Sequence, residues 1–268
     1  MRKIGFLLVL ICIIAMILYL FFSPKTDEFA EADLLTKVMQ RGYITVGVNP
    51  DSKPFAFYDS QGNLTGYDVD LANYIAEYIV KDKSRARFAV VSPSNRLIKV
   101  STGEVDMVIS TVTITPQRLE VVDFSKPYET AGQVLLVRST STVSSLQDLA
   151  GQTIGVIFGT TAERNIQRLA PTARIQGFRT YPEAYNALKA GQIFAVTSDD
   201  TILNQYAIKD KGVKILPRRY SVEPYGVAFK KGSTSERLRV EVDYALKDLR
   251  RRGILKSLHE KWGLGSEI

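Results

Sequence analysis

The chain has very little of what disulfides, metal clusters and nucleic-acid surfaces require. Its single cysteine, Cys12, excludes an intrachain disulfide and a cysteine-based metal cluster. Its single histidine, His259, lies in a C-terminal helical pattern, where we expect a solvated side chain. No block of five or six Lys and Arg residues occurs, so nucleic acid is not an expected partner despite the net charge of +7. Ser-His-Asp, Cys-His, zinc and phosphate-loop patterns are also missing, and we expect no catalytic residue, no metal and no cofactor.

The composition is that of a globular protein, with 45% hydrophobic and 24% charged residues over 268 positions. That length suffices for two domains of ordinary size. The mildly basic balance suits an anionic small ligand or a negatively charged membrane surface.

The N-terminus carries a targeting signal. Arg2 and Lys3 precede residues 4–22, which contain no charge and can span a bilayer as a helix of about 20 residues. The positive flank places the N-terminus in the cytoplasm and the rest outside. We expect residues 1–32 to be a signal peptide or an N-terminal membrane anchor plus linker. The remainder is then periplasmic or extracytoplasmic, either released or anchored to the cytoplasmic membrane by residues 4–22.

Strand and helix patterns alternate through the rest of the chain, which predicts an α/β fold in two halves. In the first half we expect Asp68 to cap the helix that follows it. Ligands bind outside the carboxyl ends of strands in open α/β sheets. The residues that follow predicted strands at those ends are Asn49, residues 110–118, residues 159–161 and residues 198–200.

The most informative stretch is residues 105–128. A short apolar run, predicted to be a buried strand, leads into the hydroxyls of Ser110, Thr111 and Thr113. Thr115 and Pro116 then read as the N-cap and first residue of a helix. Arg118 falls in the first turn, where the helix dipole disfavours a cation. An anion held between the free N–H groups and the guanidinium reverses that preference, and a carboxylate fits Arg bidentately.

Three segments resemble a known family. Residues 66–71 read Gly-Tyr-Asp-Val-Asp-Leu, residues 95–106 begin Asn-Arg and end Gly-Glu-Val-Asp, and residues 113–128 combine Thr-Ile-Thr-Pro-Gln-Arg with Val-Asp-Phe-Ser-Lys-Pro-Tyr. Together they resemble the amino-acid-binding extracellular solute receptors of ABC importers, the polar amino-acid solute-binding family 3. The resemblance covers roughly residues 33 to 265 and is closest in pattern to glutamate, aspartate and glutamine receptors.

The resemblance implies a two-lobed periplasmic-binding-protein fold of type II-like topology, with the lobes joined by two crossing strands. Residues 33–133 and 225–268 would form lobe 1, and residues 134–224 would form lobe 2. The crossings are expected near residues 133–137 and 223–229.

It also implies roles for individual residues. Arg118 would hold the α-carboxylate of an amino acid, and Asp199 would accept from its α-ammonium. Because neither lobe alone satisfies a zwitterion, the ligand would stabilise the closed state. The expected ligand-binding set is Asn49, Arg96, Ser110, Thr111, Thr113, Arg118, Gly159, Thr160, Thr161 and Asp199.

The side-chain pocket departs from the pattern of receptors for basic amino acids. Asn49 stands where such receptors often have Asp, and Ser52 and Pro93 stand where others carry aromatic rings. We expect Arg96 to point into the pocket, which favours glutamate or aspartate, with glutamine as the open alternative. The competing interpretation of Arg96 is a solvated helix residue.

The resemblance further implies an ABC permease in the cytoplasmic membrane as partner, and a monomeric receptor. Two alternatives remain. One is a membrane-tethered amino-acid sensor. The other is a periplasmic dehydratase-like enzyme, for which Glu163 and Glu223 are the candidate acids.

Overall fold

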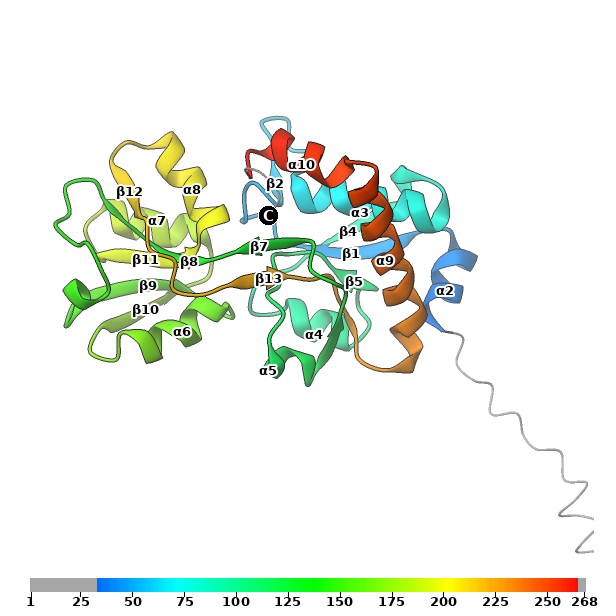
Figure 1. Ribbon diagram of the computed structural model, residues 1–268, viewed down its shortest axis with the longest axis horizontal. Coiled ribbons are helices and arrows are strands. Elements are labelled where there is room, and N and C mark those ends of the chain that lie inside the picture. The colour runs from blue at the N-terminus through cyan, green and yellow to red at the C-terminus, as the bar shows by residue number, and fades with distance from the viewer. Residues whose placement is uncertain (1–32, 265–268) are drawn as a thin grey trace, which may run out of the picture. The chain divides into compact units, whose positions relative to one another are not determined.

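The computed structural model describes residues 33–264, which form an α/β protein of two lobes, each built on a five-stranded sheet (Figure 1). This confirms the predicted fold class. The first lobe contains α2 (Leu34–Arg41), β1 (Ile44–Val48), β2 (Phe57–Tyr58), β3 (Leu64–Thr65), α3 (Tyr67–Val80), η1 (Lys83–Arg85), β4 (Ala86–Val90), α4 (Arg96–Ser101), β5 (Met107–Val108), α5 (Pro116–Leu119), β6 (Val122–Phe124), β14 (Ala228–Lys230), α9 (Ser233–Arg251) and α10 (Ile254–Trp262). The second contains β8 (Gln133–Arg138), η2 (Gln147–Leu149), β9 (Thr153–Ile157), α6 (Thr161–Leu169), β10 (Arg174–Phe178), α7 (Tyr181–Lys189), β11 (Ala195–Asp199), α8 (Asp200–Lys209) and β12 (Val213–Leu216).

The first sheet has the order β4-β1-β5-β14-β6. Strands β4 and β5 run parallel to β1, whereas β14 runs antiparallel to β5 and β6. Ile44, Val46 and Val48 of β1 are fully buried, as expected for β-branched residues of a strand in a covered sheet. Because β14 comes from the far end of the chain, the sheet is completed only after the second lobe.

The second sheet has the order β10-β9-β11-β8-β12. Strands β10 and β11 lie parallel to β9, and β8 lies antiparallel to β11 and β12. Helices α7 and α8 pack against this sheet, as does α6. The carboxyl ends of β9 and β11 therefore present the starts of α6 and α8.

Two strands cross between the lobes. Strand β7 (Glu129–Ala131) pairs antiparallel with β13 (Glu223–Tyr225), and the two lie side by side in Figure 1. The second crossing falls where the sequence predicts it. The first prediction is misplaced, because residues 133–137 belong to β8 of the second sheet, whose apolar run reflects burial there. The proposed lobe boundaries at residues 133/134 and 224/225 stay a prediction.

Two local predictions for the first lobe are wrong. Asp68 does not cap α3, because the N-cap is Gly66, where a Cβ would lie 2.2 Å from the Phe55 carbonyl oxygen. Asp68 instead lies in the first turn and is fully buried. His259 is also buried rather than solvated: its Nε2 lies 2.9 Å from Glu129 Oε2, and its ring packs on Tyr67.

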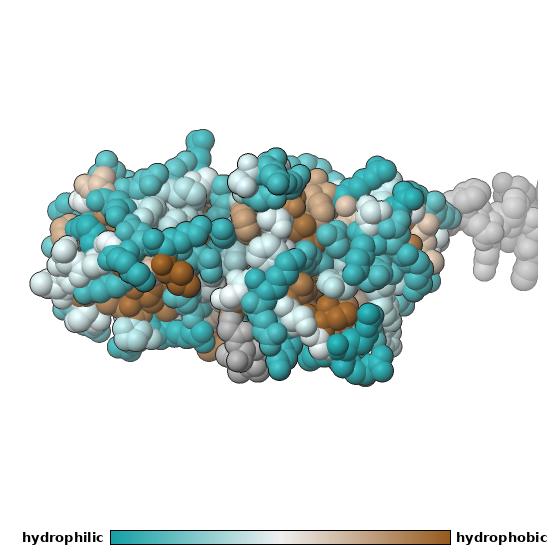
Figure 2. All heavy atoms as spheres, turned by 90° about the horizontal axis from the view of Figure 1, so that it is seen from above, coloured by the Kyte–Doolittle hydropathy of each residue, from teal (hydrophilic) through white to brown (hydrophobic). Residues whose placement is uncertain are grey.

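Hydrophilic residues cover most of the face seen in Figure 2, with separate small hydrophobic areas. Within residues 33–264, no helix has the length and apolarity needed to cross a membrane. The signal peptide or membrane anchor expected in residues 1–32 lies outside the described residues.

Candidate functional site

The turn after β5 and the helix α5 form the first-lobe side of the candidate site. Thr115 caps α5 as predicted, its Oγ1 accepting from the Arg118 N–H at 3.2 Å, and Pro116 is the first helical residue. The hydroxyl-bearing Ser110, Thr111 and Thr113 are buried in the approach to this helix. The local sequence thus places a row of donors and one cation at one edge of the sheet.

Arg118 is buried and reaches across to the second lobe. Its Nη1 donates to the Thr113 carbonyl at 2.8 Å, and its Nη2 donates to the Gly159 carbonyl at 3.1 Å. Burial, together with the charge of nearby Arg96, lowers the pKa of Arg118 to about 9. The guanidinium is therefore still charged at neutral pH.

Arg96 is buried as well, so the solvated interpretation of this residue is wrong. Its Nη1 donates to the Ser110 carbonyl and, at 3.4 Å, to the Thr111 carbonyl. Its Nε has no hydrogen-bond partner among the described residues, and neither has the Ser110 hydroxyl. Burial lowers the pKa of Arg96, whereas Tyr181 and Asp199 from the second lobe oppose that change. Arg96 thus faces the region between the lobes.

Asp199 occupies the N-cap position of α8, but its side chain forms no capping hydrogen bond. Its Oδ2 accepts from the Tyr225 hydroxyl at the end of β13. Burial and the charge of Glu223 raise the pKa of the Asp199 carboxyl, the Tyr225 bond and Arg96 lower it, and the result is a pKa of about 7. The second lobe therefore presents a buried carboxylate close to two buried guanidinium groups.

At the start of α6, the side chains that the sequence suggests for ligand binding form hydrogen bonds within the protein instead. The Thr160 hydroxyl donates to the Ile157 carbonyl and accepts from the Glu163 N–H as the N-cap, and Glu163 accepts from the Gly159 N–H. The Thr161 hydroxyl donates to Glu223 at 2.8 Å. Both threonine hydroxyls are thus engaged within the protein, which leaves backbone groups as their contribution to a ligand.

Asn49 shapes the turn after β1. Its Oδ1 accepts from the Asp51 N–H at 3.2 Å, and its carbonyl accepts from the Ser52 hydroxyl. Sequence reasoning missed Tyr181, which lies beside Ser198 and interacts electrostatically with Asp199, Arg96 and Arg118. It also missed the hydroxyl contact of Tyr225. A tyrosine at the first position of α7 was the available signal for Tyr181.

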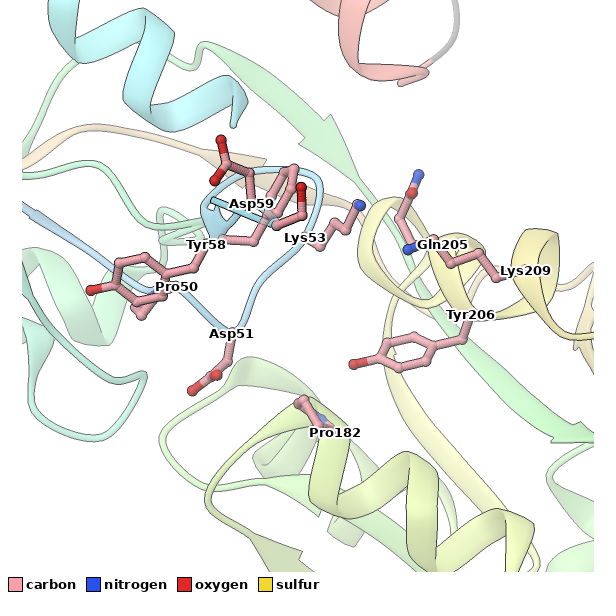
Figure 3. Close-up of a pocket in the computed structure, with 11 residues that line it drawn as sticks. Pro50, Asp51, Lys53, Tyr58, Asp59, Pro182, Gln205, Tyr206 and Lys209 are labelled. Atoms are coloured by element: carbon pink, nitrogen blue, oxygen red, sulfur yellow. The ribbon is translucent and has the colours of Figure 1, made fainter. Parts of the chain in front are cut away.

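Cavities open between the lobes on two sides. One of about 240 Å³ is lined by Arg118 and Gln117 from the first lobe and by Gly159 and Thr160 from the second. Another, of about 550 Å³, lies between the loop after β1 and helices α7 and α8, as Figure 3 shows for Asp51, Lys53 and Tyr206. Among residues 33–264, no cluster of three or more His, Cys, Asp or Glu side chains could hold a metal ion.

The raised pKa values predict that the ligand-free protein loses stability as the pH rises from 5.5 to 7.5. Burial raises the pKa of Asp68 and of Asp199 to about 7, so in this range the native state binds more protons than the unfolded state. We expect the unfolding midpoint to fall by roughly 3–10 °C. Asp199→Asn should reduce the slope.

Thermal unfolding monitored by circular dichroism at several pH values measures this slope. Asp210→Asn is the matched control, because bonds to Lys189 and Tyr185 lower the pKa of partly buried Asp210 to about 2, below the tested range. A midpoint that stays constant or rises between pH 5.5 and 7.5 contradicts the prediction.

The chain is similar to known proteins over nearly its whole length. The family model of bacterial extracellular solute-binding proteins, family 3, matches residues 44–265. The chain is 34% identical to the ABC transporter glutamine-binding protein GlnH of Bacillus subtilis (strain 168), over 98% of this chain and 97% of that protein. A mutant of ArgBP from T. maritima superposes with a TM-score of 0.80 at 32% identity, covering 86% of this chain and 99% of the other. The ancestral amino acid-binding protein AncCDT-1, a precursor of cyclohexadienyl dehydratase, gives a TM-score of 0.78 at 34% identity, with the same coverage.

The match of the family model to most of the described residues agrees with the two lobes and their crossing strands. The chain therefore belongs to the bacterial extracellular solute-binding proteins, family 3.

Proposed function

We propose that this protein is the extracytoplasmic receptor of an ABC importer and closes its two lobes around a polar L-amino acid, namely glutamate, aspartate or glutamine. The observation that carries the proposal is the set of three buried charges between the lobes. Arg96, Arg118 and Asp199 form no ion pair within residues 33–264. Buried charges are normally paired, so a zwitterion supplies the partners that these groups lack.

In this proposal the two ends of an amino acid bind to different lobes. The α-carboxylate binds Arg118 together with the donors of residues 110–113, and the α-ammonium binds Asp199. The two ends then gain their charge-assisted hydrogen bonds at the same time only when both lobes approach the ligand. Binding favours the closed arrangement because the open form offers one partner at a time.

A thermal-shift screen of the protein from residue 33 onward against the twenty amino acids tests this function. A binder present at 100 times its dissociation constant adds about 2.7 kcal/mol to the apparent free energy of unfolding. Shifts confined to a few polar amino acids support the proposal. A screen without any shift, on a folded sample, rejects it.

Arg96 decides the side-chain preference in this proposal. The charges of Arg118 and Asp199 are balanced by the α-carboxylate and the α-ammonium of the ligand. The positive charge of Arg96 therefore remains to interact with the ligand side chain. We expect L-glutamate or L-aspartate to bind more tightly than the corresponding amides, by about 1.5–3 kcal/mol, the range for hydrogen bonds to charged groups. Lysine and arginine should bind far more weakly, because they bring a second cation. Glutamine is the first alternative, in line with the glutamine-binding relative.

Arg96→Gln should remove most of the acid-over-amide preference while sparing binding of the α-groups. Lys99→Gln is the matched control, because Lys99 lies on the same helix but forms an ion pair with Glu104. Calorimetric titration with glutamate, glutamine and lysine measures the preference. Tight lysine binding by the wild type, or an acid preference that survives Arg96→Gln, shows that Arg96 does not read the side chain.

The remaining parts of the proposal concern partners and location. An ABC permease in the cytoplasmic membrane would receive the amino acid from a monomeric receptor, which gel filtration with light scattering checks. The receptor is either released or tethered by residues 4–22, and we favour the tether because that run is long enough to stay in the membrane. Mass spectrometry of the native protein distinguishes an intact chain from one that begins at Asp33.

A binding role without catalysis fits the two carboxylates that a dehydratase would need. Glu223 is buried and accepts hydrogen bonds from Thr161, Asn165 and Ser221, while Glu163 accepts from the Gly159 N–H. Both act as acceptors within the protein, which does not suit a general acid. Product formed from prephenate would favour the enzyme alternative.

A further inference from the structure

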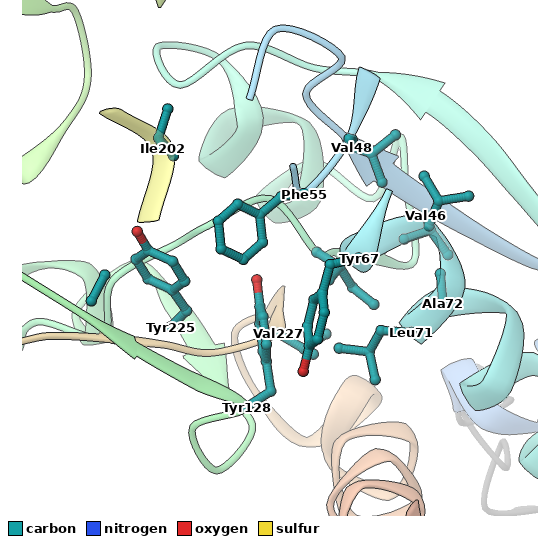
Figure 4. Packing of buried hydrophobic residues seen from close by; sticks show 14 of the residues in the cluster. Val46, Val48, Phe55, Tyr67, Leu71, Ala72, Tyr128, Ile202, Tyr225 and Val227 are labelled. Carbon is teal, nitrogen blue, oxygen red and sulfur yellow. The ribbon is translucent and has the colours of Figure 1, made fainter. Parts of the chain in front are cut away.

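Two tyrosines stand at the ends of the crossing strands. Tyr128 directly precedes β7, and Tyr225 ends β13. The Tyr128 N–H donates to the Tyr225 carbonyl at 2.9 Å, and their ring centroids are 6.2 Å apart. Both side chains are buried beside Phe55 (Figure 4). Their hydroxyls bond to different lobes.

The Tyr128 hydroxyl holds the turn that supports Arg96. It donates to Asp68 Oδ1 at 3.1 Å and accepts from the Thr111 N–H at 3.2 Å. Thr111 has a φ of 47°, a left-handed conformation that is strained for a β-branched residue and needs support from its surroundings. The carbonyls of Ser110 and Thr111 in this turn accept from Arg96. Tyr128 thus links the crossing strands β7 and β13, which we call the hinge, to the first-lobe half of the site.

The Tyr225 hydroxyl holds the second-lobe half. It donates to Asp199 Oδ2 and lies 3.3 Å from the Thr201 hydroxyl. Among the described residues, the Tyr225 hydroxyl is the one hydrogen-bond donor to the Asp199 side chain. Tyr225 is therefore placed to keep that carboxylate ionised and aimed between the lobes.

We propose that Tyr128 and Tyr225 are positioning residues of the hinge, Tyr128 fixing the Arg96 side of the site through Thr111 and Asp68, and Tyr225 fixing Asp199. The inference rests on the proposed function, since it concerns how amino-acid binding is organised. It adds that the crossing strands orient the binding groups themselves as well as joining the lobes.

The two hydroxyls should act differently on the pH dependence of binding. Asp199 is faced by Glu223 of β13 and Asp200 of α8, which disfavour its charge, and by Arg96 of α4, which favours it. Tyr181 of α7 and Arg118 of α5 lie near it too. Without the Tyr225 hydroxyl, the carboxylate loses a donor and protonates at higher pH. Loss of the Tyr128 hydroxyl leaves the Tyr225 bond to Asp199 in place.

The experiment compares Tyr225→Phe and Tyr128→Phe with the wild type, using the purified full-length protein. Tyr185→Phe is the matched control. It also removes a tyrosine hydroxyl that is bonded to an aspartate, but that aspartate is Asp210, which is not among the proposed binding residues. Calorimetric titration with L-glutamate and with L-glutamine from pH 5.5 to 8.5 gives the dissociation constant and the pH at which affinity falls. Carbon-13 NMR titration of Asp199 in the ligand-free protein gives a readout independent of ligand.

We expect Tyr225→Phe to raise the dissociation constant about tenfold or more at pH 7.5 and to move the acid-side midpoint up by about one pH unit. Tyr128→Phe should weaken binding about fivefold or more without moving that midpoint, and Tyr185→Phe should stay within about twofold of the wild type.

Phe variants that match the wild type in affinity and in Asp199 titration overturn the inference, as do variants that lose only thermal stability. A wild type that binds neither probe and also fails to bind L-aspartate overturns the proposed function instead, and the Asp199 titration still separates the two failures.

Discussion

Arg118→Ala should weaken amino-acid binding by roughly 2–5 kcal/mol while the protein stays folded, because the ligand carboxylate is left desolvated without its charged partner. The variant also loses the bond from Arg118 Nη2 to the Gly159 carbonyl, which joins the lobes directly. Stability of the ligand-free protein should change little, since the first turn of α5 loses a cation that its dipole disfavours. Calorimetry on the variant, with circular dichroism to confirm folding, measures both effects.

Arg164→Ala is the control for this experiment. Arg164 lines the same cavity and carries the same charge, but its side chain is exposed on α6. Its removal should alter affinity by less than about 1 kcal/mol, as is typical of solvated charges. Wild-type affinity in a folded Arg118→Ala protein refutes the assignment of the carboxylate to this residue.

Gly159→Ala should reduce affinity by roughly 10- to 100-fold, since overpacking typically costs about 1–3 kcal/mol. A Cβ at Gly159 would lie 2.5 Å from the Pro93 carbonyl oxygen and 2.7 Å from Ser94 Cα, both backbone atoms of the other lobe. The closed contact between the lobes then cannot form without a shift, whereas an open arrangement has no such conflict.

Gly151→Ala separates this steric effect from backbone strain. Gly159 has a φ of 80° and Gly151 a φ of 70°, so alanine is strained at both, by about 1–2 kcal/mol. A Cβ at Gly151 meets no atom within 4 Å. Both variants should lose similar stability, and only Gly159→Ala should lose affinity and the compaction on ligand addition that small-angle scattering detects. Equal losses of affinity in the two variants rule out the closure contact as the cause.

Features encoded within a few residues were accessible from the sequence. The Thr115 cap, the following Pro116 and the placement of Arg118 depend on neighbours along the chain, and the structure has all three. The two-lobed α/β architecture followed from the alternation of patterns and from the family resemblance.

Features decided by partners far along the chain were not accessible. His259 was expected in solvent, yet Glu129 and Tyr67 enclose it. Asp68 reads as a helix cap because Asp is common there, but its partner Tyr128 lies 60 residues away. The family resemblance placed the first crossing at residues 133–137, whereas the pairing that defines it is made by β7, residues 129–131, with β13 from the other end of the second lobe.

The place of β14 in the first sheet has a consequence for how the chain folds as it is made. This strand lies between β5 and β6, although the whole second lobe separates it from them in sequence. At roughly 5–20 residues per second, synthesis of β14 follows that of β5 by several seconds. During that interval the first sheet has a gap in its interior, and non-local pairings of this kind form slowly. The nascent first lobe therefore remains incompletely folded for most of translation. An incompletely folded chain can still pass through a narrow export channel.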